Sequence, residues 1–172
     1  VTNPGNPTGV VLSPEEMRLM ADIAKEHGLF LISDEVYREF VYGGEPLASM
    51  AQFDDAAENV VVVDSISKRF SACGARVGIL VSRNRELMAQ ALKICQGRLC
   101  AATLDQLGAA ALYGVGSDYF SAVREEYHRR RDTCMEGLSQ IPGVVCECPK
   151  GAFYLMAKLP VDDTDKFQTW LL

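Results

Sequence analysis

The chain lacks any uninterrupted apolar run near the roughly 20 residues that a membrane helix requires. Nothing at its start resembles a signal peptide either. Apolar residues make up 48% of the sequence and charged residues 23%, a balance typical of a soluble globular protein. We therefore expect no membrane partner, and 172 residues are enough to bury a substantial core.

Acidic residues outnumber basic ones, and the formal net charge is -6. A nucleic-acid interface needs Lys and Arg clustered along one face or one helix. The only local exception is the run Arg129-Arg130-Arg131, which lies in a segment with a helical pattern and is interpreted as a solvated face. We expect no nucleic-acid partner.

Histidine is almost absent, since only His27 and His128 could serve as imidazole ligands. The six cysteines are Cys73, Cys95, Cys100, Cys134, Cys146 and Cys148. Cys146 and Cys148 are two positions apart, but no second cysteine pair at zinc-ribbon spacing accompanies them. The sequence therefore predicts no metal site, and the cysteines are interpreted as reduced thiols of a cytoplasmic enzyme.

Neither end has the features of a natural terminus. The first residue is Val1 rather than Met, and residues 170–172 fall inside a segment with the pattern of an amphipathic helix. We expect this sequence to be part of a longer protein.

Capping signals and hydrophobic periodicity divide the chain into helices and strands. Ser13-Pro14-Glu15-Glu16 opens a helix with a capping Ser, Pro at the first helical position and Glu three residues after the cap. Apolar runs without polar alternation follow at 29–32, 60–63 and 77–81, and such runs are typical of strands covered on both faces. The predicted fold class is therefore α/β, with a mostly parallel sheet and flanking helices.

The second half of the chain is expected to be mainly helical before its character changes. Helices are predicted at 85–96, 104–112 and 117–140, and shorter strands at 144–148 and 152–159. This shift predicts a domain boundary. Residues 1–117 would belong to one domain, and residues 118–172 would comprise a long connecting helix and the beginning of a small α+β domain.

Polar side chains follow two of the predicted strands. Asp34 and Tyr37 come after the strand at 29–32, and Lys68 comes after the strand at 60–63. Taken singly, Asp34 would be a helix N-cap and Lys68 a surface lysine. Ligands of open α/β sheets bind beyond the carboxyl ends of the strands, so parallel neighbouring strands would bring all three residues to one rim.

The segment around Lys68 combines an amine with hydroxyl groups and a second cation. Lys68 can condense with an aldehyde to form a Schiff base. Ser65, Ser67 and Arg76 offer the donors and the positive charge that a phosphate dianion needs. The segment could thus hold an aldehyde cofactor that carries a phosphate.

A turn rich in restricted residues, Asn3-Pro4-Gly5-Asn6-Pro7-Thr8-Gly9, opens the chain and fixes the Asn6 amide. Its Asn6–Pro7 bond could be cis. Together, Asn6-Pro7-Thr8-Gly9, Asp34-x-x-Tyr37 and Ser65-x-Ser67-Lys68, with Arg76 following eight positions after Lys68 (76 − 68 = 8), resemble the fold-type I pyridoxal-phosphate aminotransferases, the aspartate aminotransferase group. The resemblance covers nearly the whole chain. It implies that residues 1–117 are the C-terminal part of the large cofactor-binding domain.

The resemblance also implies pyridoxal 5'-phosphate as the cofactor and a role for each residue. Lys68 would carry the cofactor as a Schiff base and then move a proton between Cα and C4′. Asp34 would pair with the pyridine nitrogen, so that the ring becomes an electron sink. Asn6 and Tyr37 would hydrogen-bond the phenolic oxygen O3′.

By the same resemblance, Ser65 and Arg76 would hold the phosphate, with Ser67 as a helper, and Arg suits a bidentate grip. The substrates would be an amino acid and a 2-oxo acid, and the full-length protein would be a homodimer. A Gly-containing phosphate loop, an aromatic residue stacked on the ring and an Arg for the substrate carboxylate have no match in this chain. We expect the fragment alone to be inactive and to bind the cofactor weakly.

Three other functions are compatible with parts of the sequence. A penicillin-recognising serine hydrolase also uses Ser-x-x-Lys, here Ser65 and Lys68, but its Ser-Asp-Asn and Lys-Thr-Gly motifs are missing. An aminotransferase-like effector domain of a transcriptional regulator would retain Lys68 and Asp34. A lyase or decarboxylase with the same cofactor would retain them too, and the identity of the amino donor stays open.

Overall fold

The computed structural model describes residues 1–43 and 47–172. Helix α1 (Pro14–Glu26) begins where the sequence predicts, because Ser13 Oγ accepts from the Glu16 amide while the Glu16 carboxylate accepts from the Ser13 amide. The buried side chains of α1 are Met17, Ala21 and Ala24. They lie on one face, as the predicted spacing of apolar residues requires.

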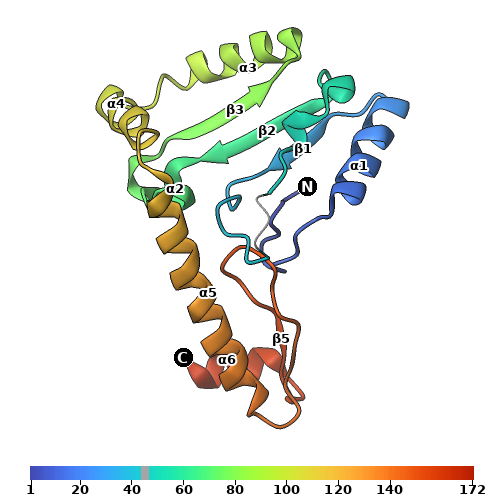
Figure 1. Ribbon diagram of the computed structural model, residues 1–172, viewed down its shortest axis with the longest axis vertical. Coiled ribbons are helices and arrows are strands. Elements are labelled where there is room, and N and C mark those ends of the chain that lie inside the picture. The colour runs from blue at the N-terminus through green and yellow to red at the C-terminus, as the bar shows by residue number, and fades with distance from the viewer. Residues whose placement is uncertain (44–46) are drawn as a thin grey trace.

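Three strands form the main sheet in the order β1-β2-β3, and their bounds are β1 (Leu31–Asp34), β2 (Val60–Ser65) and β3 (Gly78–Ser82). Strands β1 and β2 are parallel, whereas β3 is antiparallel to β2. Residues 66–77 turn the chain back beside the strand that it has just left, so β3 needs no crossover connection. Helix α1 lies beside one edge of the sheet and α3 and α4 beside the other, which confirms the α/β class with flanking helices (Figure 1).

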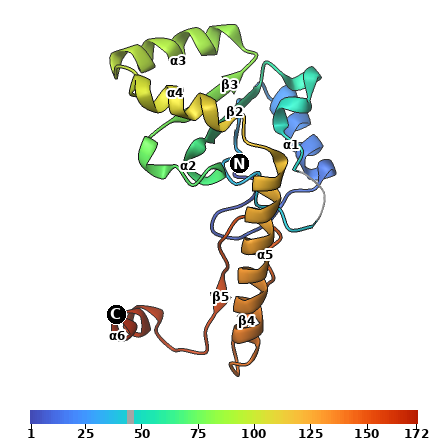
Figure 2. The same ribbon diagram turned by 60° about the vertical axis from the view of Figure 1, so that its left-hand side comes forward.

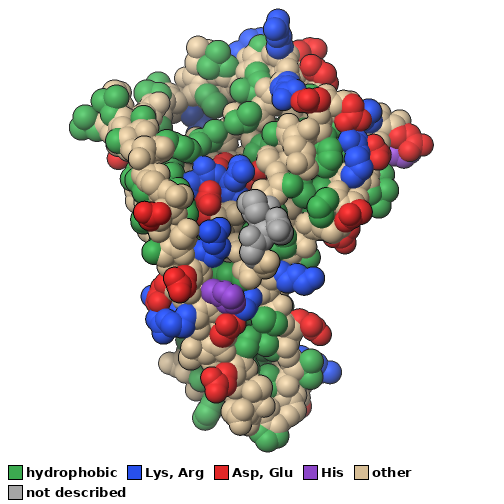
Figure 3. Space-filling model, in the orientation of Figure 1, with side chains coloured by type: hydrophobic (Ala, Val, Ile, Leu, Met, Phe, Trp, Pro, Cys, Tyr) green, Lys and Arg blue, Asp and Glu red, His purple; other side chains and the backbone are tan. Residues whose placement is uncertain are grey.

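Only the central strand is covered as the apolar runs predict. Val60, Val61 and Val62 of β2 are all buried. By contrast, Ile32 of β1 is 54% exposed and Val81 of β3 is 49% exposed, and hydrophobic side chains reach the surface over the sheet and around α4 (Figure 3). The prediction of cover on both faces is therefore wrong for β1 and β3 within the described residues, since the described segments leave about half of each of these residues exposed. The first strand also lies two residues later than the predicted range 29–32.

Short helices and turns connect the strands. They are η1 (Met50–Gln52), η2 (Asp54–Ala56), α2 (Ile66–Arg69) and η3 (Cys73–Ala75). The longer helices that follow β3 are α3 (Arg85–Gly97), α4 (Thr103–Leu112) and α5 (Ser117–Ser139), close to their predicted ranges. Helix α5 leads away from the sheet, and the last part of the chain lies beside and beyond its far half (Figure 2).

The strands predicted after α5 are shorter than expected. Strands β4 (Val145–Cys146) and β5 (Ala157–Lys158) pair antiparallel, and α6 (Thr164–Leu171) follows. The first half of the predicted strand 152–159 is not a strand, because its aromatic side chains pack against the segment after β1 instead. Across the described residues, no helix combines the length and the apolar character needed to cross a membrane.

The arginine run in α5 is only partly solvated. Arg129 and Arg130 both pair with Glu126 on the exposed face, as the solvated-face interpretation predicts. The side chain of Arg131, however, is only 15% exposed. Its guanidinium lies 4.9 Å from the centre of the Tyr42 ring, so this arginine connects α5 to the loop after β1.

Candidate functional site

The turn at residues 3–9 lies against the end of β1. The Asn3 amide donates to the Asp34 carbonyl at 2.9 Å, and Thr2 forms a parallel bridge with Asp34. The Asn6–Pro7 peptide bond is cis, the isomer that the sequence leaves open. At the other end of the turn, the carbonyl of Gly9 accepts from two consecutive amides, those of Lys150 and Gly151, both at 2.9 Å.

Asp34 and Lys68 occupy equivalent places at the ends of two parallel neighbours. Asp34 is the last residue of β1 and stands opposite Val63 of β2, and Lys68 lies in α2, directly after β2. The Phe153 ring lies between Lys68 and Tyr37, which follows Asp34 by three positions: the Lys68 ammonium lies 5.8 Å from its centre and the Tyr37 ring centre lies 5.1 Å from it. The structure therefore brings Asp34, Tyr37 and Lys68 to one end of the sheet.

The hydroxyl of Tyr37 has two side-chain hydrogen-bond partners. It shares a hydrogen bond of 2.6 Å with the Tyr154 hydroxyl, and Asn6 Nδ2 lies 3.5 Å away and donates to it. Burial raises the pKa of Tyr37 above its ordinary value, and the bond to Tyr154 and the negative charge of Asp34 raise it further. Tyr37 thus stays protonated near neutral pH and remains able to donate a hydrogen bond.

The two serines lie together at the start of α2. Ser65 caps the helix, with its Oγ accepting from the Ser67 amide at 3.1 Å and lying 2.8 Å from Ser67 Oγ. Ser65 Oγ is also 3.0 Å from the Val77 carbonyl oxygen. Arg76 precedes Val77 in a left-handed conformation (φ 56°), and its exposed guanidinium donates to the Cys73 carbonyl rather than to either serine.

Phe153 and Tyr154 lie at the candidate site, although the sequence pattern predicts that they belong to a strand at 152–159. They pack with Tyr37, Phe40 and Tyr127 in an aromatic cluster at the end of the sheet. Their only local signal is that two aromatic residues follow Gly151-Ala152 at a turn. This pattern predicts a strand as readily as a binding site, so the sequence alone could not identify them.

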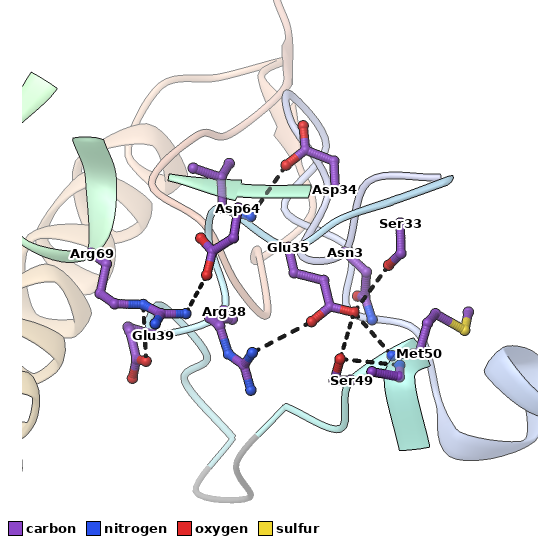
Figure 4. Close-up of polar contacts among 12 residues, drawn as sticks. Asn3, Ser33, Asp34, Glu35, Arg38, Glu39, Ser49, Met50, Asp64 and Arg69 are labelled. Atoms are coloured by element: carbon purple, nitrogen blue, oxygen red, sulfur yellow. Dashed lines mark hydrogen bonds and ion pairs between the residues drawn. The ribbon is translucent and has the colours of Figure 1, made fainter. Parts of the chain in front are cut away.

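A row of partly buried charged side chains, which no sequence motif indicates, runs from Arg69 to Glu35 close to Asp34 (Figure 4). Glu35 is 1% exposed, and one of its oxygens, Oε1, accepts from the Ser49 hydroxyl and the Met50 amide. Arg38 lies 3.6 Å from the other oxygen. The position of Glu35 next to Asp34 could have indicated these contacts from the sequence, because a buried carboxylate needs hydrogen-bonding or charged partners.

Arg69, the residue after Lys68, forms the second part of this row. Its Nη2 lies 2.5 Å from Asp64 Oδ2, and its Nε lies 3.5 Å from Glu39 Oε1. Burial raises the pKa of Asp64, while the nearby guanidinium of Arg69 works in the opposite direction. The three residues join the end of β2 to the segment that follows Tyr37.

The donor set fits a phosphorylated pyridine aldehyde. Within residues 1–43 and 47–172, Lys68 makes no ion pair, so its amine is not committed to an acid. Asp34 accepts a hydrogen bond from the Val36 amide and has lone pairs left for a ring nitrogen. The clustered hydroxyls of Ser65 and Ser67 and the exposed guanidinium of Arg76 match the needs of a phosphate.

Comparison with known proteins agrees with this chemistry. The family model described as aminotransferase class I and II matches residues 1–172. A probable aspartate/prephenate aminotransferase of Aquifex aeolicus is 37% identical over 158 residues, which cover 90% of this chain and 40% of that protein. An aspartate aminotransferase of Musicola paradisiaca is 35% identical and aligns with 100% of this chain and 44% of its own length.

Solved structures give the same result. The N-succinyldiaminopimelate aminotransferase from Mycobacterium tuberculosis superposes with a TM-score of 0.87 at 31% identity, over 99% of this chain and 45% of that one. The aspartate aminotransferase from Thermotoga maritima gives a TM-score of 0.86 at 30% identity, over 99% and 44%. The chain thus spans less than half the length of these relatives. It belongs to the class I and II aminotransferases.

Proposed function

We propose that the protein to which this chain belongs is an aminotransferase that moves an amino group between an amino acid and a 2-oxo acid. The class I and II aminotransferases depend on pyridoxal 5'-phosphate. The observation that carries the proposal is the meeting of Asp34, Tyr37 and Lys68 at one end of the β1 and β2 pair in a member of this family.

Lys68 would act at the aldehyde of the bound cofactor, and Asp34 would act at the ring nitrogen on the opposite side of the ring. When bound, pyridoxal phosphate supplies an electron sink that stabilises negative charge on the α carbon of the amino acid. Lys68 offers the amine that binds the cofactor covalently and that accepts and returns the proton of the α carbon. Asp34 would hold a proton on the ring nitrogen, because a carboxylate favours the charged form of a nearby base.

The other site residues would hold and orient the cofactor. Tyr37 stays protonated, so its hydroxyl can donate to the ring oxygen, and Asn6 can do the same through its amide. Ser65, Ser67 and Arg76 would bind the phosphate. The guanidinium of Arg76 would have to leave the Cys73 carbonyl or bind both groups at once.

The substrates, the assembly and the domain division belong to the same proposal. The relatives named above carry several substrate names, among them aspartate, prephenate and N-succinyldiaminopimelate, so we propose only the classes amino acid and 2-oxo acid. We further propose a homodimer in the cytoplasm, and a division between residues 1–117 and 118–172 at the start of α5.

Aminotransfer is better supported than the other functions open to this sequence. The relatives at more than 30% identity named above carry aminotransferase names, which favours transfer over elimination, decarboxylation or a regulatory effector role. The serine hydrolase alternative is excluded by the family. Within the described residues, the hydrogen-bond partners of the Ser65 hydroxyl are Ser67 and the Val77 carbonyl, and neither partner is a general base.

Reductive labelling tests the proposal. The protein is mixed with about 1 mM pyridoxal phosphate, a concentration at which a site worth about 4 kcal/mol is half filled. Borohydride then fixes the bound cofactor, and mass spectrometry maps the adducts. We expect Lys68 to be labelled in preference to Lys93 of the exposed helix α3, and Asp34→Asn to weaken this preference. Equal labelling of the two lysines would contradict the proposal.

A further inference from the structure

The helix that carries Lys68 cannot fix its own orientation. Helix α2 has four residues, and an isolated helix of this length is unstable because nucleation is costly. Ser71, two residues after the end of α2, has a φ of 53°, a backbone conformation that residues other than glycine rarely adopt. Ile66 and Phe70 of this segment are buried, but apolar contacts are not directional. A directional contact is therefore needed to set the rotation of α2.

Arg69 provides such contacts. Its guanidinium donates a hydrogen bond to Asp64 at 2.5 Å, forms a longer ion pair with Glu39 at 3.5 Å and lies 5.8 Å from the centre of the Tyr113 ring. The side chains of Arg69 and Asp64 are each only 11% exposed. Separating the two charges of a largely buried ion pair would leave each of them without water or a partner. Such a pair is therefore held more firmly than a solvated one.

The two acids come from the two segments that build the site (Figure 4). Asp64 precedes Ser65 at the end of β2, and Glu39 follows Tyr37 by two positions. Consecutive residues of a helix point about 100° apart, so a fixed Arg69 also fixes the direction of Lys68. Lys68 accordingly faces the Phe153 ring while Arg69 faces Asp64 and Glu39.

We infer that Arg69 is a positioning residue: its bonds to Asp64 and Glu39 set the rotation of α2 and hold the Lys68 amine toward the end of β1. This inference rests on the proposed function. It adds a residue that touches neither cofactor nor substrate and acts only through Lys68.

The labelling ratio of Lys68 to Lys93 measures this role in variants that keep the folded circular dichroism spectrum, because Lys93 is exposed and reports the labelling of a solvated lysine. In Arg69→Met, we expect the ratio at about 1 mM pyridoxal phosphate to fall about tenfold, which corresponds to about 1.4 kcal/mol. Arg69→Lys keeps a cation opposite Asp64, so the ratio should recover to within about threefold of the original. Arg83→Met is the matched control, because Arg83 and Asp54 form an ion pair with side chains 62% and 79% exposed. Its ratio should not change.

The outcomes separate the inference from the proposed function. If the unsubstituted protein shows no preference for Lys68, the proposed function fails and the inference fails with it. If the preference exists and a folded Arg69→Met protein keeps it, only the positioning role is overturned. Failure of Arg69→Lys to recover the labelling ratio also overturns the positioning role alone. Should Arg69→Met lose its folded circular dichroism spectrum, Glu39→Gln takes its place. An unchanged ratio in that folded variant overturns the inference, and a fall of about threefold supports it.

Discussion

The hydroxyl groups of Tyr37 and Tyr154 lie 2.6 Å apart, although 117 positions separate the two residues. Tyr37 follows the strand that ends at Asp34, whereas Tyr154 belongs to the turn that precedes β5. The bond therefore joins a candidate cofactor ligand to the last third of the chain. Tyr37 is 4% exposed and Tyr154 is half-buried, so the contact is partly shielded from water and should affect both stability and titration.

Replacing Tyr154 with Phe should lower the pKa of Tyr37, because the hydrogen bond to Tyr154 is one of the influences that raise it. The loss of the bond should also reduce the free energy of unfolding by about 1 kcal/mol. Tyrosinate absorbance during an alkaline titration measures the first effect, and urea unfolding measures the second. Tyr113→Phe is the control, since this side chain is 51% exposed and lies outside the site. A Tyr37 transition that stays where it was would contradict the prediction.

Gly9 and Gly28 form a matched pair for testing the contact between the first turn and residues 149–151. Both have positive φ, 69° and 60°, so an Ala at either position is strained by about 1 kcal/mol. At Gly28 nothing lies within 4 Å of the added Cβ, whereas at Gly9 the Cβ would overlap the Pro149 side chain. We expect Gly9→Ala to cost about 2 kcal/mol more than Gly28→Ala in urea unfolding. Equal losses would mean that the turn shifts freely away from Pro149.

Glu35→Gln should destabilise the protein by about 2 kcal/mol, although the substituted side chain has nearly the same shape. The reason is the loss of the negative charge that Oε1 presents to the Ser33 and Ser49 hydroxyls and the Met50 amide. Glu58→Gln replaces an exposed carboxylate and serves as the control. Urea unfolding of the two variants gives the comparison, and a loss below about 0.5 kcal/mol for Glu35→Gln would show that the charge of this carboxylate is unimportant.

Acid should remove the contribution of Asp55 to stability. Hydrogen bonds from Arg18 and from Lys25 lower the pKa of Asp55 to about 2. An aspartate in the unfolded chain titrates near 3.9, so the folded state holds the charge more strongly and Asp55 stabilises the fold above about pH 4. This contribution disappears as the pH falls through about 2. The difference in thermal midpoint between the protein and Asp55→Asn should accordingly be present at neutral pH and shrink in acid.

The control for this titration is Asp162→Asn, because Asp162 makes no ion pair within the residues that the structure describes. Its effect on the thermal midpoint at neutral pH should be smaller than that of Asp55→Asn. Added salt should reduce the effect of Asp55→Asn, since the ion pairs of Asp55 are solvated. A difference that grows as the pH falls would have the wrong sign and would refute the assignment.

Elements marked by local chemistry could be predicted from the sequence, and elements defined by distant partners could not. Helix α1 begins at its predicted position because its cap, Ser13 with Glu16, is encoded within four residues. The run at 29–32 is apolar throughout, so periodicity could not show that the strand begins only where Leu31 meets Val60. The same limit applies to Phe153, which leaves the predicted strand because Tyr37 and Phe40 offer it a better packed environment.

The candidate site divides in the same way. The sequence predicts Lys68, Asp34 and Tyr37 as site residues, because their side-chain chemistry and their positions after the strands both point to one end of the sheet. The partners that orient them were not, since an arginine after Lys68 has no distinguishing sequence signal until Asp64 and Glu39 are seen on either side of it. Motifs identify the groups that react, and tertiary contacts identify the groups that orient them.

The carbonyl of Gly9 that receives the amides of Lys150 and Gly151 also has a consequence for biosynthesis. Residues 149–151 are translated about 140 residues after the first turn (149 − 9 = 140). Until then Asn6 has no fixed place beside Tyr37, and a nascent chain can form the sheet without a finished pocket. Cofactor capture should therefore follow the synthesis of residues 149–151 rather than precede it.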